Sequence, residues 1–265
     1  MASAPRRRPE IVGMLQLRPL PGAARYVDEP LDRIIEAVLT DAQALSDAGF
    51  SGVQVQNMGD NPSTRHVGLE TVAYMTRACS AVRSAFPKLS LSVLVNWDAE
   101  ASLAVADSVG ADFVRVEHTW VGASVTSWGI SEASCYQATR FRARIRSRVP
   151  IYADLFEPHA VPLVQQSVEW WARAAVHEGG ADGVFVTAKT LAESLDGVRR
   201  VRDVLPGVPV WLGGGATAQN IDVVSDLVDG VTVATSIKHG DMTNPVDPGL
   251  AAAFCRAATQ ASQQR

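Results

Sequence analysis

The stretch Trp211-Leu-Gly-Gly-Gly-Ala-Thr217 decides how the rest of the chain is interpreted. An apolar segment that begins at Val208 runs into three consecutive glycines and then into a threonine that can cap a helix. Glycine has no Cβ, so its backbone N–H groups can approach an anion closely. The start of the following helix would add the positive end of its dipole at the same point. By themselves, the three glycines fit a tight turn equally well.

A second segment of the same kind, Gly230-Val-Thr-Val-Ala-Thr-Ser236, follows and ends in small hydroxyl residues. Two successive strand–loop units of this kind build the phosphate site in the last part of a (βα)8 barrel. We therefore predict that a phosphorylated small molecule binds where the two loops meet. The residues expected to hold its phosphate are Gly213, Gly214, Gly215, Thr235 and Ser236.

Short apolar segments alternate with segments of helical periodicity along the whole chain. Helix-sized crossovers between short strands indicate a parallel sheet, and eight such units favour a closed barrel over an open sheet. No Gly-x-Gly-x-x-Gly follows the first strand, which argues against a dinucleotide-binding fold. The expected strands are 11–17, 52–57, 89–97, 112–118, 150–155, 182–187, 208–212 and 230–235. The expected helices are 30–49, 66–86, 98–109, 131–147, 162–178, 191–205, 218–227 and 248–261.

Length and composition fit a single α/β domain, a TIM barrel over residues 10–262 with a flexible tail at 1–9. The formal net charge of −4 argues against nucleic-acid binding. No apolar run is long enough to span a bilayer, so we expect no integral membrane segment. Three well-separated cysteines are typical of a reduced, cytoplasmic protein. The pair Trp170-Trp171 on an outer helix would suit a homo-oligomer.

Polar residues inside the predicted strands concentrate toward the strand ends that form the mouth of a barrel, where barrel enzymes place their sites. Arg115 and Glu117 are two residues apart, so both face the same side of their strand. Tyr152 and Asp154 share a side in the same way. A buried polar side chain needs a partner or a ligand. Arg115 therefore forms either a buried ion pair with Glu117 or Asp154, or a contact with substrate.

Three residues are candidates for catalysis. Asp154 ends an apolar strand, so loss of solvent would raise its pKa while Arg115 would oppose the rise. Glu117 is the second carboxylate, and two carboxylates in different surroundings can divide acid and base work. Lys189 pairs with an anionic substrate or acts as an amine nucleophile if it is desolvated, and is otherwise a solvent-exposed loop lysine.

The residues expected to contact the rest of the substrate end other strands or lie in the loops beyond them. The long segment from Trp120 to Gly129 is either a lid whose two tryptophans cover a ring, a surface loop or a subunit contact. We predict no cofactor, although Asp154, Glu157, His159 and His118 leave a divalent metal open. The predicted substrate-binding residues are Gln16, Asn57, Asn96, Arg115, His118, Trp128, His159 and Thr187.

The whole chain resembles the BtpA/SgcQ family of (βα)8 proteins. The motifs that carry the resemblance are Leu17-Arg-Pro-Leu-Pro-Gly22, Gln56-Asn-Met-Gly-Asp60, Asn96-Trp-Asp-Ala99, Asp112-Phe-Val-Arg-Val116, Ser127-Trp-Gly-Ile130, Ala153-Asp154 with His159-Ala160, Gly213-Gly-Gly-Ala-Thr217 and Thr243-Asn-Pro-Val-Asp247. The resemblance implies a barrel with a phosphate-type site and kinship to barrels that handle phosphosugars and nucleotides. Some members of the family carry the name of photosystem I biogenesis factors.

Three departures from the family pattern lie near the mouth. Gln16 stands where the family has a histidine, and Ala188-Lys189 replaces a glycine-containing segment. The residue before His159 is usually basic, whereas the segment here is Phe156-Glu157-Pro158-His159. They indicate an altered substrate. The sequence thus favours an enzyme acting on a phosphorylated sugar or nucleoside-like molecule, by glycosidic bond cleavage or formation, or as a lyase or isomerase. The alternative is a non-catalytic, membrane-peripheral assembly factor.

Overall fold

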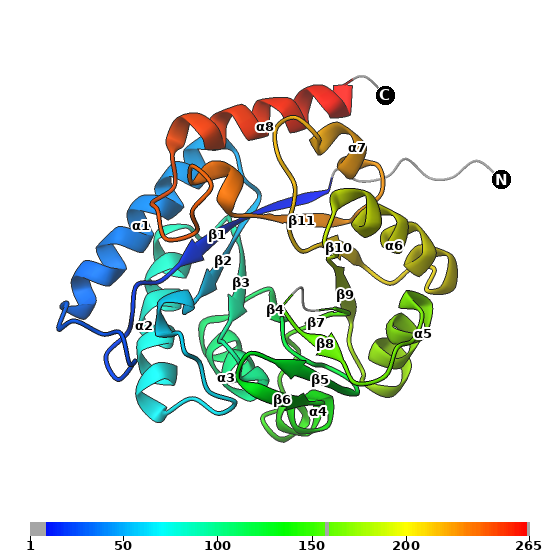
Figure 1. The fold of residues 1–265 in the computed structure, drawn as a ribbon. Helices are drawn as coiled ribbons and strands as arrows, with labels where there is room; N and C mark the ends of the chain where they lie inside the picture. The colour runs from blue at the N-terminus through cyan, green and yellow to red at the C-terminus, as the bar shows by residue number, and fades with distance from the viewer. Residues whose placement is uncertain (1–8, 157–158, 264–265) are drawn as a thin grey trace.

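The computed structural model describes residues 9–156 and 159–263. Eight parallel strands form its centre: β1 (Glu10–Gln16), β2 (Gly52–Gln56), β3 (Ser90–Leu94), β4 (Phe113–Val116), β7 (Ile151–Asp154), β9 (Gly183–Val186), β10 (Val210–Leu212) and β11 (Gly230–Val233). They close into a barrel in the order β1-β11-β10-β9-β7-β4-β3-β2 (Figure 1). The predicted (βα)8 barrel is confirmed. The predicted tail falls almost wholly outside the described residues.

Helices surround the barrel on its outer side (Figure 1). They are α1 (Leu31–Ala48), α2 (Leu69–Ala85), α3 (Ala99–Val109), α4 (Cys135–Arg144), α5 (Val168–Arg173), α6 (Leu191–Val204), α7 (Ile221–Ser225) and α8 (Pro248–Gln263). The first shows how the sequence sets them. Its apolar residues recur at helical spacing and are buried against the strands, and Gly49 ends it with a left-handed φ of 94°. Within the described part of the chain, no helix is both long and apolar enough to cross a bilayer.

Two helices differ from the prediction in ways that affect the mouth. The helix expected at 162–178 begins only at Val168, where the Ser167 side chain accepts a hydrogen bond from the Trp170 N–H, and continues as a π-helix over Ala174–Glu178. The helix expected at 218–227 is α7, which covers Ile221–Ser225. Thr217 does not cap it: Asn220 is the N-cap residue, and the Asn220 side chain accepts a hydrogen bond from the Thr217 N–H at 2.8 Å.

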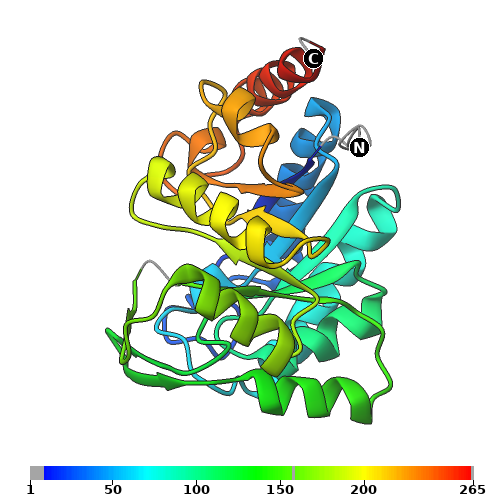
Figure 2. The same ribbon diagram turned by 90° about the vertical axis from the view of Figure 1, so that its right-hand side faces the viewer.

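The expected loop after β4 is instead a β-hairpin. Its strands β5 (Ala123–Thr126) and β6 (Gly129–Glu132) join β8 (Val161–Pro162) in an antiparallel sheet of order β6-β5-β8. Pro162 was expected to begin a helix, and Val161 to end the loop before it, but both pair with β5 instead. Figure 2 shows this small sheet beside α4 and α5, outside the barrel wall. The sequence prediction of an irregular segment was wrong because the paired strands come from both sides of β7.

The barrel interior has two layers. The lower layer, which we call the floor cluster, consists of Val12, Phe113, Tyr152, Phe185 and Trp211. Its rings pack at centroid distances of 4.8 Å for Phe113–Tyr152 and 5.1 Å for Phe113–Trp211. The floor cluster fills the barrel below the mouth, so a small-molecule site inside the barrel at the mouth must lie above it.

Candidate active site

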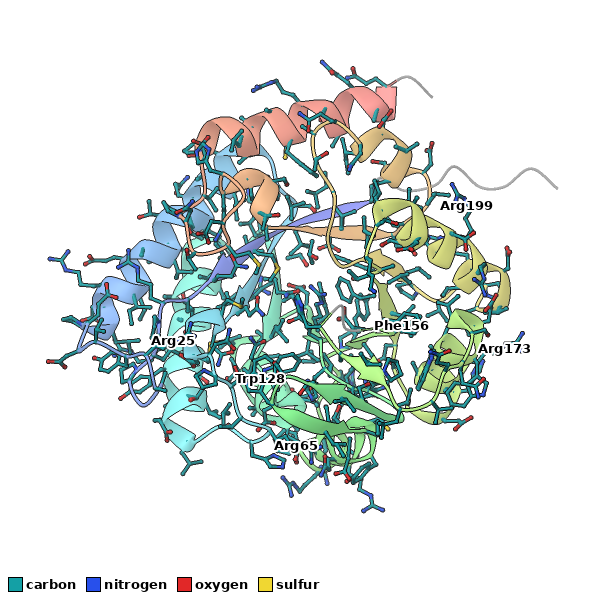
Figure 3. All side chains as sticks on the ribbon, viewed as in Figure 1. Arg25, Arg65, Trp128, Phe156, Arg173 and Arg199 are labelled. Carbon is teal, nitrogen blue, oxygen red and sulfur yellow. The ribbon has the colours of Figure 1, made fainter. Side chains whose placement is uncertain are left out.

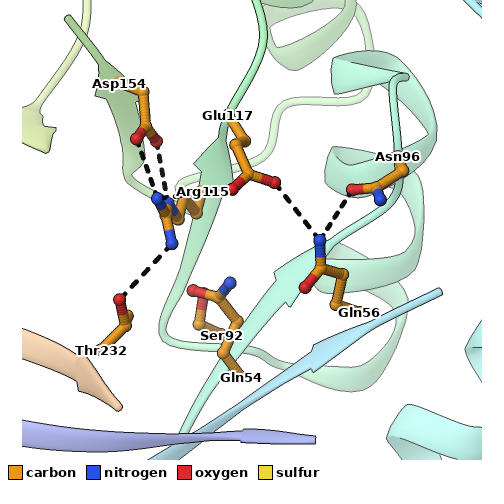
Figure 4. Close-up of polar contacts among 8 residues, drawn as sticks. All are labelled: Gln54, Gln56, Ser92, Asn96, Arg115, Glu117, Asp154 and Thr232. Atoms are coloured by element: carbon orange, nitrogen blue, oxygen red, sulfur yellow. Dashed lines mark hydrogen bonds and ion pairs between the residues drawn. The ribbon is translucent and has the colours of Figure 1, made fainter. Parts of the chain in front are cut away.

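Arg115 and Asp154 form a buried ion pair above the floor cluster (Figure 4). Arg115 Nε donates to Asp154 Oδ2 and Nη2 donates to Oδ1, each at 2.8 Å. The Arg115 guanidinium lies 4.4 Å from the ring centroid of Phe185, and Nη1 reaches Thr232 Oγ1 at 3.4 Å. The Asp154 side chain is only 1% exposed. Both of its oxygens are therefore engaged in positioning Arg115.

Glu117 lies next to this pair and is more accessible, since 29% of its side chain is exposed. Its Oε1 lies 3.7 Å from Arg115 Nη2, and its Oε2 accepts a hydrogen bond from Gln56 Nε2 at 3.3 Å. The same Gln56 amide donates to Asn96 Oδ1 at 3.1 Å (Figure 4). Burial raises the pKa of Glu117 above its ordinary value; Arg115 opposes the rise and Asp154 adds to it. Glu117 is thus the carboxyl group at the mouth best placed to hold and release a proton.

Gly213 packs against the ion pair. A Cβ at this position would lie 2.3 Å from Thr187 Oγ1 and 2.8 Å from Arg115 Nη2, so a side chain cannot fit without movement. The Gly213 N–H donates to the carbonyl of Val186 at 3.3 Å. The first of the three glycines therefore lets β10 approach Arg115. The Thr187 hydroxyl is buried and has no hydrogen-bond partner among the described residues.

Gly214 and Gly215 face open space, because a Cβ at either position would have no neighbour within 4 Å. Gly215 has a φ of 83°, which glycine adopts readily. Neither N–H donates to a backbone acceptor in the part of the chain that the structure describes. The Ser236 hydroxyl donates to the Ala216 carbonyl at 3.0 Å and joins this loop to the one after β11, where Thr235 is exposed. The structure thus brings the two predicted phosphate loops together.

His118 and Trp128 lie on the side of the mouth beyond β4. His118 is buried, and burial lowers its pKa to about 4, with smaller contributions from Arg65 and His66. The Trp128 ring, half exposed at the tip of the β5–β6 hairpin, lies 5.2 Å from the ring of Trp97. Trp120, the other predicted lid tryptophan, is buried and donates to the Ala175 carbonyl at 3.1 Å. Trp120 therefore anchors the hairpin to the π-helix and does not cover the mouth.

Two predicted substrate-binding residues hold the protein's own groups. The Asn57 side chain accepts from the Asn96 N–H at 2.7 Å and donates to Asp60 at 2.8 Å, so it fixes the loops after β2 and β3. Gln16 accepts a hydrogen bond from Lys238 Nζ at 2.9 Å. Lys238 is fully buried, and burial lowers its pKa while Asp41 opposes the shift.

The remaining predicted residues lie at the edge of the mouth. His159 is exposed, yet close enough to Glu117 to lower the pKa of that carboxyl group. Lys189 is exposed in the segment before α6, which leaves its amine solvated. Glu157 lies outside the described residues. Among residues 9–156 and 159–263, no three His, Cys, Asp or Glu side chains cluster in a way that could hold a metal.

Four residues gain importance that the sequence did not indicate: Gln56, Thr232, Trp97 and Lys238. Gln56, the last residue of β2, links Glu117 to Asn96 through its side-chain amide, a contact that only the structure reveals. No sequence signal paired Trp97 with Trp128, because they lie on separate loops.

A closed (βα)8 barrel with an ion-pair network and two glycine- or hydroxyl-containing loops at its mouth defines the class of protein. The family model described as the BtpA family matches residues 7–260, and the chain belongs to this family. It is 31% identical to the photosystem I biogenesis protein BtpA of Synechocystis sp., over 93% of this chain and 87% of that protein.

Solved structures share the fold at low sequence identity. One is 3-hexulose-6-phosphate synthase, with a TM-score of 0.56, 17% identity, and coverage of 94% of this chain and 99% of that one. Another is thiamine phosphate pyrophosphorylase from Pyrococcus furiosus, with a TM-score of 0.54, 15% identity, and coverage of 95% and 96%. Both comparisons establish a shared barrel architecture.

Proposed function

We propose that the protein is an enzyme acting on a phosphorylated sugar or nucleoside-like molecule at the C-terminal mouth of the barrel. The observation that carries this proposal is the state of Glu117, a half-buried carboxyl group of raised pKa beside a fixed arginine. An acid with a raised pKa beside an open mouth suits general acid–base catalysis near neutral pH.

Each polar residue of the mouth has a role in this proposal. Asp154 engages Arg115 with both oxygens, so we assign it to positioning and give the proton transfer to Glu117. Gln56 and Asn96 orient the Glu117 carboxyl group. Protonation of a leaving oxygen or nitrogen by Glu117 would assist glycosidic bond cleavage, and the reverse step its formation. A lyase or isomerase reaction would use the same group to move a proton.

The phosphate would bind at the two joined loops. The open N–H groups of Gly214 and Gly215 and the hydroxyl of Thr235 supply the donors. Gly213 supports the site by admitting Arg115, and Ser236 by tying the loops together. The two solved barrels above are named for enzymes of phosphorylated compounds, which agrees with this assignment. Lys189 is solvated and receives no step in the chemistry.

Binding is tested by thermal unfolding with ribose 5-phosphate, nucleoside monophosphates and inorganic phosphate. At least one should raise Tm, by an amount that grows with ligand concentration. Gly214→Asp should abolish the rise because it places a negative charge at the anion site. Gly214→Ala is the matched control, since its methyl group enters open space and should leave binding intact. A Tm that no phosphorylated compound raises would sink the phosphate assignment.

Catalysis is tested with Glu117→Gln, which keeps the shape of the side chain and removes the proton. Turnover of whichever phosphorylated compound is accepted should fall by about 100-fold or more, while the Tm rise on binding persists. Unchanged turnover in this variant would remove Glu117 from the mechanism.

An assembly role is the second candidate function. Exposed apolar side chains gather on the small sheet and the segment that follows it: Val125, Ile130, Val161, Leu163 and Val164. A relative named as a photosystem I biogenesis protein makes this surface relevant. Protein whose Tm responds to none of the phosphorylated compounds, and whose surface variants lose a partner, would favour this role.

A further inference from the structure

A second cavity of about 380 Å³ lies beside the mouth, outside the barrel. Its walls come from the loops after β2 and β3, the end of β4, the β5–β6 hairpin and α4. Its volume falls within the range of small-molecule sites. Figure 3 shows Trp128 and Arg65, two of the lining residues, on the hairpin side of the barrel. The phosphate loops after β10 and β11 contribute nothing to this cavity, so it is a separate part of the surface.

Two indole rings form the apolar part of the cavity. The rings of Trp97 and Trp128 are 5.2 Å apart and inclined at 60°, so they enclose a corner. Trp128 is 51% exposed, so about half of the surface of a large aromatic side chain is open to a ligand. Trp97 Nε1 is buried and has no acceptor among the described residues. A buried donor without an acceptor costs free energy, and a ligand that brings an acceptor atom would recover it.

Two of the charged side chains around the cavity, Arg65 and Asp98, already form hydrogen bonds or ion pairs with other groups of the protein. Arg65 donates to the Ile130 carbonyl at 2.9 Å and pairs with Glu132 at 3.1 Å. Asp98 accepts from the N–H groups of Ala101 and Val67 at 3.0 and 3.1 Å. The cavity therefore offers flat aromatic surface and hydrogen-bonding edges, and its lining carries one arginine, Arg65, against three carboxylates, Asp98, Glu100 and Glu132. An anion would gain less here than an uncharged ring.

His118 connects this cavity to the catalytic mouth. It lines the large cavity and also a small cavity of about 30 Å³ that Glu117 and Asp154 line. Its imidazole is neutral at physiological pH, because burial lowers its pKa to about 4, and a neutral imidazole both donates and accepts hydrogen bonds. A ligand held in the large cavity would thus have its inner edge one side chain away from Glu117.

We infer that this cavity binds a planar heteroaromatic ring carrying a hydrogen-bond acceptor, of the chemical class of the nucleobases. The ring stacks on Trp128, and its acceptor atom receives the Trp97 indole N–H. The inference rests on the proposed function only in that the rest of the same ligand would extend into the mouth. It narrows the substrate class from phosphosugars in general to ring-bearing nucleosides or nucleotides.

Calorimetry with the full-length protein tests the ring site separately from the phosphate site. The probes are adenosine, guanosine, cytidine and uridine, which carry a ring and no phosphate, and ribose 5-phosphate, which carries a phosphate and no ring. At least one nucleoside should bind, and Trp128→Ala should weaken it about tenfold because stacking on the indole is lost. Trp170→Ala removes a similarly exposed tryptophan from α5 and is the matched control, with binding unchanged. Trp97→Phe should also weaken binding, since it keeps a ring and removes the donor.

Two results would overturn the ring site: no nucleoside binds the unaltered protein, or Trp128→Ala binds it as tightly as Trp170→Ala does. Neither result touches the proposed function if ribose 5-phosphate still raises Tm in a manner that Gly214→Asp abolishes. Conversely, nucleoside binding that depends on Trp128 would stand even if ribose 5-phosphate fails to bind.

Discussion

The floor cluster and the mouth are built from the same strands, two residues apart, yet they differ completely in chemistry. Residues two apart on a strand point to the same side, so an aromatic residue of the floor cluster is followed two positions later by a polar or small residue at the mouth. The pairs are Phe113 and Arg115 on β4, Tyr152 and Asp154 on β7, Phe185 on β9 and Thr187 just after it, and Trp211 on β10 and Gly213 just after it. The first residue of each pair fills the barrel interior, and the second lines the mouth of the barrel.

The floor cluster and the mouth are stabilised in different ways. An aromatic ring of the floor cluster is stabilised by burial and by contacts with several neighbours, so losing one contact removes only part of that stabilisation. Arg115 depends mainly on one carboxylate, because Asp154 receives hydrogen bonds from two of its nitrogens while Glu117 lies 3.7 Å away. Removing one partner from a buried pair leaves the other charge without compensation. The mouth should therefore respond more sharply than the floor cluster to a single substitution.

The largest effect should come from Arg115→Met. It leaves the Asp154 carboxylate buried and unpaired, and we expect the free energy of unfolding to fall by about 3–5 kcal/mol. Phe113→Leu in the floor cluster should cost only about 1–2 kcal/mol, since most of the apolar volume is kept. Urea denaturation of the two variants measures the difference.

The double variant Arg115→Met, Asp154→Leu gives the control. With both charges gone, it should recover much of the lost stability. A double variant no more stable than Arg115→Met would mean that the cost comes from packing. The contrast between mouth and floor cluster would then disappear.

Much of the fold could be predicted because its signals are local. Apolar strands, helical periodicity and the glycines that end helices such as α1 and α3 are all read within a short window. The small sheet could not be predicted in this way. β5 pairs with β8, a two-residue strand whose partner lies on the other side of β7 in the chain. Its neighbours Ala160 to Leu163 have no strand periodicity of their own.

The sequence predicted which residues of the candidate site lie together better than it predicted the roles that we propose for them. Alternation placed Arg115, Glu117 and Asp154 on the inner side of their strands, where the structure has them together. The sequence favoured Asp154 over Glu117 as the acid because Asp154 ends an apolar strand, and the exposure of the two side chains was unknown. Arg115 occupies both oxygens of Asp154 with two hydrogen bonds. These bonds depend on the positions of single atoms, which the spacing of residues along the chain does not specify.

A pH-dependent effect should follow from His118. Its pKa is about 4 in the folded protein and near its ordinary 6.5 when unfolded, so the unfolded state binds the proton more tightly. Stability is therefore full above about pH 6.5 and is lost as pH falls from 6.5 toward 4, by at most roughly 3 kcal/mol. His118→Gln should remove this loss, so its Tm should fall less than that of the unaltered protein between pH 7 and 4.5.

His177→Gln is the control, because this histidine is exposed on the π-helix after α5. It should leave the pH profile of Tm unchanged. Parallel profiles for the unaltered protein and His118→Gln would show that His118 is not kept neutral by burial. The polar wall shared by the two cavities would then be charged in mildly acidic solution.

The smallest effect should come from Thr232→Val at the boundary between the layers. Thr232 Oγ1 accepts from Arg115 Nη1 at 3.4 Å, which is long for a hydrogen bond, and Asp154 already holds the guanidinium. Valine keeps the shape of threonine, so we expect the free energy of unfolding to fall by about 1 kcal/mol or less. Urea denaturation measures it beside Arg115→Met. A loss as large as that of Arg115→Met would mean that the third contact of Arg115 matters as much as its carboxylate. Every contact of Arg115 at the mouth would then be required for stability. The difference in stability loss between mouth and floor cluster would be larger than the two hydrogen bonds to Asp154 can explain.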